Sequence, residues 1–202
     1  MITQIRDHQT DRFRDATLTA RTDAQSANTQ SPSTQSIETT RLSLNALRAS
    51  DITAFTAVFA DKHAARMTHT LPHPLEPYGA EVLLARMMQT PFTHLAIRTG
   101  DETLVGMISL TEAICGADDR LHSFGPNLSV FITPAEQGQG YALEAVNGLL
   151  RWCKKRKLHR IIHAAHFSDN EASARVLIAA DFLYTGRRTT GTSLARDGEH
   201  QI

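Results

Sequence analysis

Apolar residues recur along the chain with two different periods, which predicts a succession of strands and helices from about residue 37. Leu42, Leu44 and Ala46 alternate with polar residues, as in a strand with one buried face. Ser50 then offers an N-cap to a helix. The apolar positions of that helix are Ile52, Phe55, Val58 and Phe59. The folded part of the chain is therefore expected to open with a strand and a helix.

The middle of the chain predicts a second helix and an antiparallel hairpin. The segment from His69 to Pro77 contains three prolines and is predicted to be a loop. The helix after it has an apolar face made of Ala80, Leu83, Leu84, Met87 and Met88. Residues 93–99 and 103–110 flank the turn Gly100-Asp101, which is typical of a hairpin. A loop over residues 111–126 follows.

The segment from Leu128 to Ala142 predicts a buried strand, a loop with two glycines and the first turn of a helix. The segment that follows is expected to form a helix to about Lys157, because its apolar residues would lie on one face. They are Ala142, Val146, Leu149, Leu150 and Cys153. A strand over residues 160–167 would complete a strand-loop-helix-strand unit.

The last part of the chain predicts one more helix and two short strands. Asn170 is one candidate for the helix cap, and Ser168 in a capping box with Glu171 is the other. The apolar face of this helix comprises Val176, Leu177 and Ala180. Strands are expected at residues 182–186 and 190–195. The order of elements predicts an α+β domain with a mixed, mostly antiparallel central sheet.

Composition narrows the class of protein. The 202 residues suffice for one domain with a substantial core, and residues 1–36 are polar without a sustained period. We therefore expect a disordered extension over residues 1–36 and a single domain over 37–202. The 21 basic and 21 acidic residues balance, which gives no argument for nucleic acid or membrane as a partner. Two cysteines and no targeting or spanning segment indicate a cytoplasmic protein.

The loop over residues 137–142, here called the glycine loop, carries the strongest chemical signal. Gly138 and Gly140 allow close approach of a ligand to the backbone. The first turn of the following helix presents unpaired N–H groups with about half a positive charge, so an anionic cofactor is expected. A dinucleotide site needs a third glycine where Leu143 stands, and a P-loop needs a lysine that is absent.

The motif Gln137-x-x-Gly140-x-Ala142 between a strand and a helix resembles the acetyl-CoA pyrophosphate loop of the GNAT superfamily of N-acyltransferases. Glu38 to Leu44 is similar to the opening T-x-R-L-x-L strand of that family, and Asp169 to Leu177 is similar to its N-x-x-S-x-x-V-L helix start. Ser173 with Val176-Leu177 is most similar to the branch of the ribosomal-protein N-terminal acetyltransferases. The resemblance covers residues 37–186 and implies a GNAT-like sheet with helices on both faces.

The resemblance implies acetyl-CoA as co-substrate, with no metal. The pantetheine arm would pair with the strand before the glycine loop, and the loop amides would hold the pyrophosphate. A backbone N–H near Phe131 or Ile132 would stabilise the oxyanion formed when a neutral amine attacks the thioester. The residues expected to bind acetyl-CoA are Val130, Phe131, Ile132, Thr133, Gln137, Gly138, Gln139, Gly140, Tyr141, Ala142 and Asn170.

Three residues are candidates for proton transfer. Ser173 is a candidate donor to the departing CoA thiolate, directly or through water. Glu112 is the first candidate base for the amine proton, and His122 is an alternative in the same loop. The structural alternatives are helix capping for Ser173 and solvated loop positions for the other two. Many family members have a tyrosine acid where Leu177 stands, so that acid is absent here.

Some positions depart from the family pattern. Val130 stands where the branch often has tyrosine, and Asp181-Phe182 replaces the usual Gly-Phe after the last helix. A left-handed Asp costs about 1–2 kcal/mol relative to Gly. His163 and His166 are expected on opposite faces of a strand and so cannot share a metal. The basic residues from 154 to 160 are expected to complement a helix C-terminus, although one of them is a candidate contact for the 3′-phosphate of CoA.

The sequence predicts an N-acetyltransferase that uses acetyl-CoA on a primary amine, with a protein N-terminus as the first expectation for the acceptor. A small amine, such as an amino acid, a polyamine or an antibiotic, is the alternative acceptor. A CoA-binding interaction module without transfer activity is the alternative from another class. A nucleic-acid binder that uses the basic residues is a third, and it predicts strongly salt-dependent binding. The expected assembly is a monomer or a homodimer.

Overall fold

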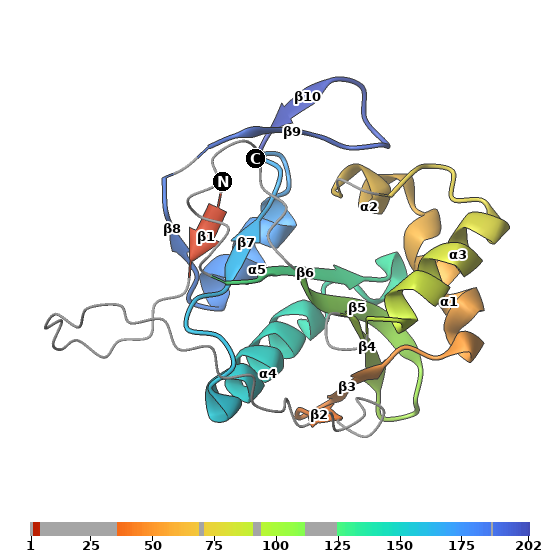
Figure 1. The fold of residues 1–202 in the computed structure, drawn as a ribbon, viewed down its shortest axis with the longest axis horizontal. Coiled ribbons are helices and arrows are strands. Elements are labelled where there is room, and N and C mark those ends of the chain that lie inside the picture. Colours follow the sequence, from red (N-terminus) through yellow and green to blue (C-terminus); the bar gives the residue numbers. More distant parts are fainter. Residues whose placement is uncertain (1, 5–35, 69–70, 91–93, 112–124, 187) are drawn as a thin grey trace, which may run out of the picture.

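Strands from distant parts of the chain form one eight-stranded sheet in the order β2-β3-β4-β5-β6-β7-β1-β8 (Figure 1). The computed structural model describes residues 2–4, 36–68, 71–90, 94–111, 125–186 and 188–202. The strands of the sheet are β1 (Ile2–Gln4), β2 (Ile37–Glu38), β3 (Leu42–Ala46), β4 (His94–Thr99), β5 (Leu104–Thr111), β6 (Asn127–Ile132), β7 (His163–Ala165) and β8 (Leu183–Tyr184). All neighbouring strands are antiparallel except β6 and β7, which are parallel.

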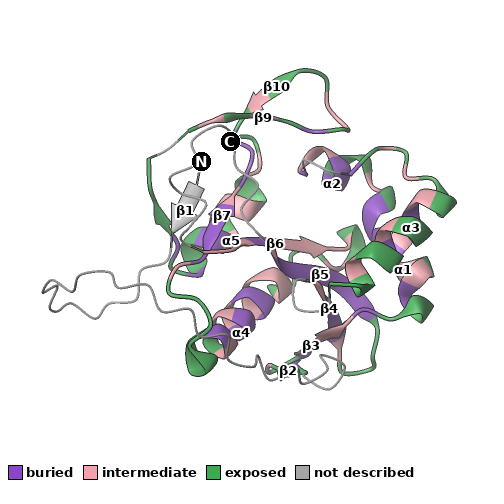
Figure 2. Ribbon diagram, in the orientation of Figure 1, coloured by how far each residue is buried: buried purple, intermediate pink, exposed green. Residues whose placement is uncertain are grey.

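Helices cover both faces of this sheet. They are α1 (Ile52–Ala60), α2 (Lys62–Arg66), α3 (Pro77–Met88), α4 (Tyr141–Arg156) and α5 (Glu171–Ala179). Helices α4 and α5 share one core cluster with the sheet, whereas α1, α2 and α3 share a second cluster on the other face. The strand β5 lies between the two clusters and is almost entirely buried, as Figure 2 shows. None of the helices within the described ranges is long and apolar enough to cross a membrane.

A bulge in β5 changes which of its residues face each core, so that Val105 lies in the same cluster as Ile108 and Leu110. Ile97 pairs with Gly106 and Arg98 pairs with Leu104, so Val105 has no partner of its own in β4. Val105 packs in the cluster of α4, and Leu104 packs in the cluster of α1 and α3. The hairpin predicted from the turn at Gly100-Asp101 is confirmed.

The predicted strand-loop-helix-strand unit is also confirmed, as β6, α4 and parallel β7. The strand predicted over residues 160–167 is shorter than expected, because β7 pairs with β6 at only two positions before the two diverge. Of the two caps considered for α5, Asn170 is the one used, since its Oδ1 accepts the N–H of Ser173 at 3.0 Å. The α+β architecture with helices on both faces is confirmed.

The start of α1 differs from the sequence prediction. Ser50 is not the cap, because a 3-10 turn over Ala49–Asp51 precedes the helix. The carboxylate of Asp51 accepts the backbone N–H of Arg48 and the guanidinium of Arg98, both at 2.7 Å. Since Arg98 and Asp51 are both buried, this ion pair draws Asp51 inward and begins the helical turn before Ser50 can cap it.

The N-terminal strand joins the sheet beside β7. Strand β1 lies between β7 and β8 and is antiparallel to both, although the sequence predicted disorder there. Residue 1 and residues 5–35 of the predicted extension lie outside the described residues. Near the other end, the separate hairpin of β9 (Thr190–Thr192) and β10 (Glu199–Gln201) follows β8.

Candidate functional site

The sheet contains an open edge where β6 outruns its parallel neighbour. The two strands pair only at Asn127 with His163 and at Leu128 with Ala164. Residues 129–132 of β6 continue beside β5 but have no strand on their other side within the described part of the chain. These four residues are here called the open edge.

The register shows which backbone groups the open edge presents. The N–H of Thr133 donates to the carbonyl of Val105 at 2.9 Å, so Thr133 points toward β5. Because hydrogen-bonding directions alternate along a strand, Val130 and Ile132 point their N–H and C=O groups away from β5. Phe131 points its N–H toward β5. A ligand lying along the open edge would therefore meet the amides of Val130 and Ile132.

The glycine loop continues from the end of β6 into α4. A 3-10 turn over Pro134–Glu136 precedes it, and Gly140 is the N-cap of α4. Gly138 and Gly140 have φ values of 78° and 79°, in the left-handed region that favours glycine. In the described residues, the amides of residues 138–142 donate to no protein acceptor. These free donors at a helix N-terminus suit a phosphate group.

Gln137 holds the loop to the strand. Its side-chain Nε2 donates to the carbonyl of Ile132 at 3.0 Å, and its backbone N–H donates to Pro134 at 3.4 Å. The sequence prediction included the Gln137 amide among the phosphate donors. The structure narrows the row of free amides to residues 138–142.

Helix α5 begins shortly after β7, the parallel neighbour of β6. The cap residues of α5 therefore follow the strand that ends beside the open edge. Asn170 and Ser173 are brought together there by the cap hydrogen bond. Both side chains are partly exposed. Glu112 and His122, the candidate bases, lie outside the described residues.

Arg196 anchors the turn between β9 and β10 next to this cap. It donates two hydrogen bonds to the carboxylate of Asp169, at 2.9 and 3.1 Å, and a third to the carbonyl of Arg66. Its side chain is only 2% exposed. The hydrogen bonds from Arg196 hold the pKa of Asp169 below its ordinary value. Arg196 therefore links Asp169, the residue before Asn170, to the end of α2.

Polar residues line the sheet where the open edge begins, on the face opposite α4. The hydroxyls of Ser109 in β5 and Ser129 in β6 are 2.9 Å apart. His94 of β4 pairs in register with Ser109. Burial lowers the pKa of His94, which favours a neutral imidazole. Sequence reasoning missed these residues, although serine in two otherwise apolar strands was an available signal.

The described residues contain neither a reactive cysteine nor a cluster of metal-ligating side chains. Cys153 is 1% exposed, and burial raises the pKa of its thiol to about 11, so it is not a reactive thiolate at neutral pH. Across the ranges that the structure describes, no group of three or more His, Cys, Asp or Glu residues is placed to hold a metal. Cys115 lies outside those ranges.

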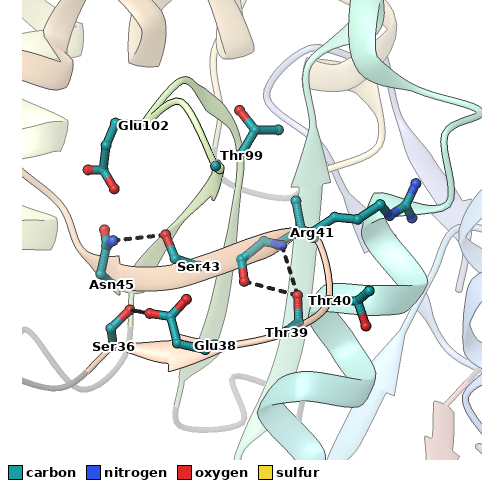
Figure 3. Close-up of a pocket in the computed structure, with 11 residues that line it drawn as sticks. Ser36, Glu38, Thr39, Thr40, Arg41, Ser43, Asn45, Thr99 and Glu102 are labelled. Atoms are coloured by element: carbon teal, nitrogen blue, oxygen red, sulfur yellow. Dashed lines mark hydrogen bonds between the residues drawn. The ribbon is translucent and has the colours of Figure 1, made fainter.

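A polar pocket of about 440 Å³ lies beside β2 and β3, as Figure 3 shows. Its lining residues are Ser36, Glu38, Thr39, Thr40, Arg41, Leu42, Ser43, Asn45, Thr99, Gly100 and Glu102. None of them belongs to the open edge or the glycine loop. The side chain of Arg41 extends away from the other labelled residues and toward α4.

Residues 41–183 match the family pattern described as an acetyltransferase (GNAT) domain. Among curated proteins, none matches the chain. A GNAT-family acetyltransferase from Bacillus anthracis is 19% identical with a TM-score of 0.62, over 72% of this chain and 82% of that chain. The ribosomal-protein-S5-alanine acetyltransferase from Vibrio fischeri is 20% identical with a TM-score of 0.62, over 83% and 93%.

A third similar structure is the ribosomal L7/L12 alpha-N-protein acetyltransferase RimL in complex with coenzyme A. It is 15% identical with a TM-score of 0.61, over 83% of this chain and 95% of that chain. At these identities the three structures establish likeness of fold. The GNAT-like fold predicted from the sequence is confirmed.

Proposed function

Because the chain belongs to the GNAT acetyltransferase family, we propose that it transfers the acetyl group of acetyl-CoA to the N-terminal amine of a protein. The observation that carries the choice of donor is the row of free amides at residues 138–142, which directly follows the open edge of β6. The free amides suit the pyrophosphate of acetyl-CoA, and the open edge suits its amide-bearing pantetheine arm, so one molecule could use both.

Acetyl-CoA supplies an activated acetyl thioester. The amides of the glycine loop and the N-terminus of α4 would hold the phosphates, since they are preorganised donors at the positive end of a helix. The outward-facing amide of Ile132, next to the glycine loop, would pair with the pantetheine arm. The thioester is at the end of that arm remote from the phosphates, so the outward-facing amide of Val130 is our choice for the donor to the thioester oxygen. The N–H of Phe131 points toward β5 and is not available.

The proton-transfer groups follow the sequence prediction. Ser173 is proposed as the donor to the CoA thiolate, and its place at the start of α5, next to Asn170, supports a role close to the pantetheine arm. Glu112 is proposed as the base that takes the proton of the amine, through water. Positioning supplies most of the rate enhancement in this scheme, and no acyl-enzyme is formed.

The acceptor class is argued from the similar structures. Two of the three are named for acetylation of ribosomal proteins, and their similarity covers more than four fifths of this chain. A small amine is the alternative acceptor. We also propose that the protein works in the cytoplasm, where both acetyl-CoA and newly made protein N-termini occur.

The test is an acetyl-transfer assay with matched acceptors. Peptides with a free N-terminus and no lysine would be compared with the same peptides blocked at the N-terminus, with lysine-bearing blocked peptides and with a panel of small amines. Release of the CoA thiol and the mass of the acceptor would be measured. Transfer only to free N-termini is expected.

Two outcomes would overturn this function. Transfer to small amines alone would reassign the acceptor. Saturable binding of acetyl-CoA without thiol release for any acceptor would instead favour the binding module.

A further inference from the structure

The carboxylate of Glu144, in the first turn of α4, is bound by the segment that joins β2 to β3. Its Oε1 accepts the hydroxyl of Thr39 and the backbone N–H of Arg41, each at 2.7 Å. Its Oε2 accepts Nε of Arg41, also at 2.7 Å. Desolvation raises the pKa of Glu144, but these hydrogen bonds and the Arg41 charge outweigh it and leave the pKa lowered. Glu144 is thus a charged anchor that joins residues more than 100 positions apart in sequence.

Arg41 also reaches the glycine loop itself. Its Nη1 donates to the carbonyl of Gln139 at 3.0 Å, and its guanidinium carbon lies 4.8 Å from the ring centre of Tyr141. Its Nη2 lies 3.6 Å from the position that a Cβ on Gly140 would occupy. One guanidinium therefore bridges the loop and the helix, and it lies beside the glycine that caps the helix.

The hydrogen bond to Gln139 fixes the direction of a phosphate donor. The carbonyl of Gln139 and the N–H of Gly140 belong to one peptide plane and point in opposite directions. While Arg41 holds this carbonyl on its own side, the N–H of Gly140 must face the other side of the loop. Gly138 and Gly140 flank Gln139, and glycines restrain the backbone little. A side chain that holds this peptide plane therefore limits the conformations of the loop.

We propose that Arg41, anchored by Glu144 and Thr39, is a positioning residue that aims the N–H of Gly140 at the phosphates of acetyl-CoA. This inference rests on the proposed function, because it assumes that the glycine loop binds those phosphates. Arg41 acts through the loop backbone, so its effect depends on the geometry of the guanidinium as well as on its charge.

The test uses four variants of the full chain: Arg41→Gln, Arg41→Lys, Glu144→Ala and the control Arg48→Gln. Arg48 forms a comparable ion pair with Glu102 at 3.0 Å, but that pair is exposed and does not touch the loop. Binding of acetyl-CoA would be measured by calorimetry. The ratio of kcat/KM for acetyl-CoA to kcat/KM for S-acetylpantetheine, which lacks the phosphates, would be measured for each variant.

Arg41→Gln is expected to weaken acetyl-CoA binding by about tenfold or more, the usual effect of a lost charge-assisted hydrogen bond. It should lower the kcat/KM ratio equally, because catalysis with S-acetylpantetheine does not depend on the phosphates. Arg41→Lys should behave like Arg41→Gln, since one ammonium cannot bridge Gln139 and Glu144 together. Arg48→Gln should change neither quantity.

Glu144→Ala separates positioning from simple charge attraction. Removing a carboxylate near an anion site should tighten acetyl-CoA binding if only charge matters. The anchor proposed for Glu144 predicts weaker binding instead. Tighter or unchanged binding in Glu144→Ala, or wild-type binding in Arg41→Lys, would overturn the inference. Failure of the wild-type chain to bind acetyl-CoA would instead refute the proposed function, and circular dichroism would confirm that each variant is folded.

Discussion

Replacing Gly140 by alanine tests whether the left-handed backbone of the glycine loop is needed for binding. The matched change is Gly138→Ala, because both glycines have φ near 78°. Space is not the obstacle at either position. A Cβ on Gly140 would make only an ordinary contact of 3.6 Å with Arg41, and a Cβ on Gly138 would meet nothing within 4 Å. The perturbation is therefore conformational in both variants.

The magnitude follows from the cost of a left-handed conformation for a residue with a Cβ, which is about 1–2 kcal/mol. If the loop keeps its shape, this cost lowers the unfolding free energy, and a chain of this size loses about 2–4 °C in Tm per kcal/mol. If the loop relaxes to a negative φ, the cost appears as weaker binding by about 5- to 30-fold. The loss of unfolding free energy and the loss of binding free energy should together equal the cost of the left-handed conformation, about 1–2 kcal/mol.

We expect Gly140→Ala to lose more acetyl-CoA affinity than Gly138→Ala. The N–H of Gly140 is held in place through Gln139 and belongs to the cap of α4, whereas Gly138 lies two residues earlier, outside the cap. Calorimetric Kd and thermal unfolding would be measured on both variants. Gly100→Ala is the control, because Gly100 stands in the β4–β5 turn with no atom near its Cβ position.

Two results would refute this reasoning. Wild-type affinity together with wild-type Tm in Gly140→Ala would mean that the left-handed backbone is not required. A loss of acetyl-CoA affinity in Gly138→Ala as large as that in Gly140→Ala would contradict the role given to the N–H of Gly140.

Three further outcomes are expected. Asp181 has a φ of 61° after α5, so Asp181→Gly should raise the unfolding free energy in urea by about 1 kcal/mol, whereas Asp181→Ala should not. Asp51→Ala leaves the buried Arg98 without its carboxylate partner and should cost about 3–5 kcal/mol of unfolding free energy, whereas Glu102→Ala in the exposed pair should cost less than about 1 kcal/mol. Burial lowers the pKa of His163 from 6.5, so on unfolding in mild acid this side chain takes up a proton. The unfolding free energy should therefore fall as the pH drops below about 6.5, and it should fall less in His163→Leu.

Local patterns predicted most of the fold. Alternation in β3 and helical spacing in α1 and α4 follow from the backbone periods of strand and helix, which turn one set of side chains toward the core, so a single sequence contains them. The family resemblance placed Asp181 at the position of a glycine and indicated the cost of a left-handed Asp there, and Asp181 does adopt that conformation, with φ of 61°. The amide of Phe182 donates to the carbonyl of Leu177 at 3.0 Å, which completes that helix end.

Partners distant in sequence were the part that could not be predicted. The carboxylate of Asp51 is drawn inward by Arg98, 47 residues later, and that contact displaced the expected cap at Ser50. Similarly, Arg41 was visible only as part of an opening-strand motif. Nothing in its neighbours indicates that Glu144 is its partner, because charge alone matches it equally well with many carboxylates.

The glycine loop shows why such distant contacts decide the chemistry of a short motif. Glycines make the loop able to adopt its shape, but the same freedom would also permit many other shapes. Two side chains remove that freedom: Gln137 fixes the start of the loop to Ile132, and Arg41 fixes its middle at Gln139. A loop ordered before binding loses less entropy when the ligand arrives, so its amides bind more tightly. The phosphate binding that we propose for the glycine loop would thus depend on the contacts of Gln137 and Arg41 as well as on the glycines.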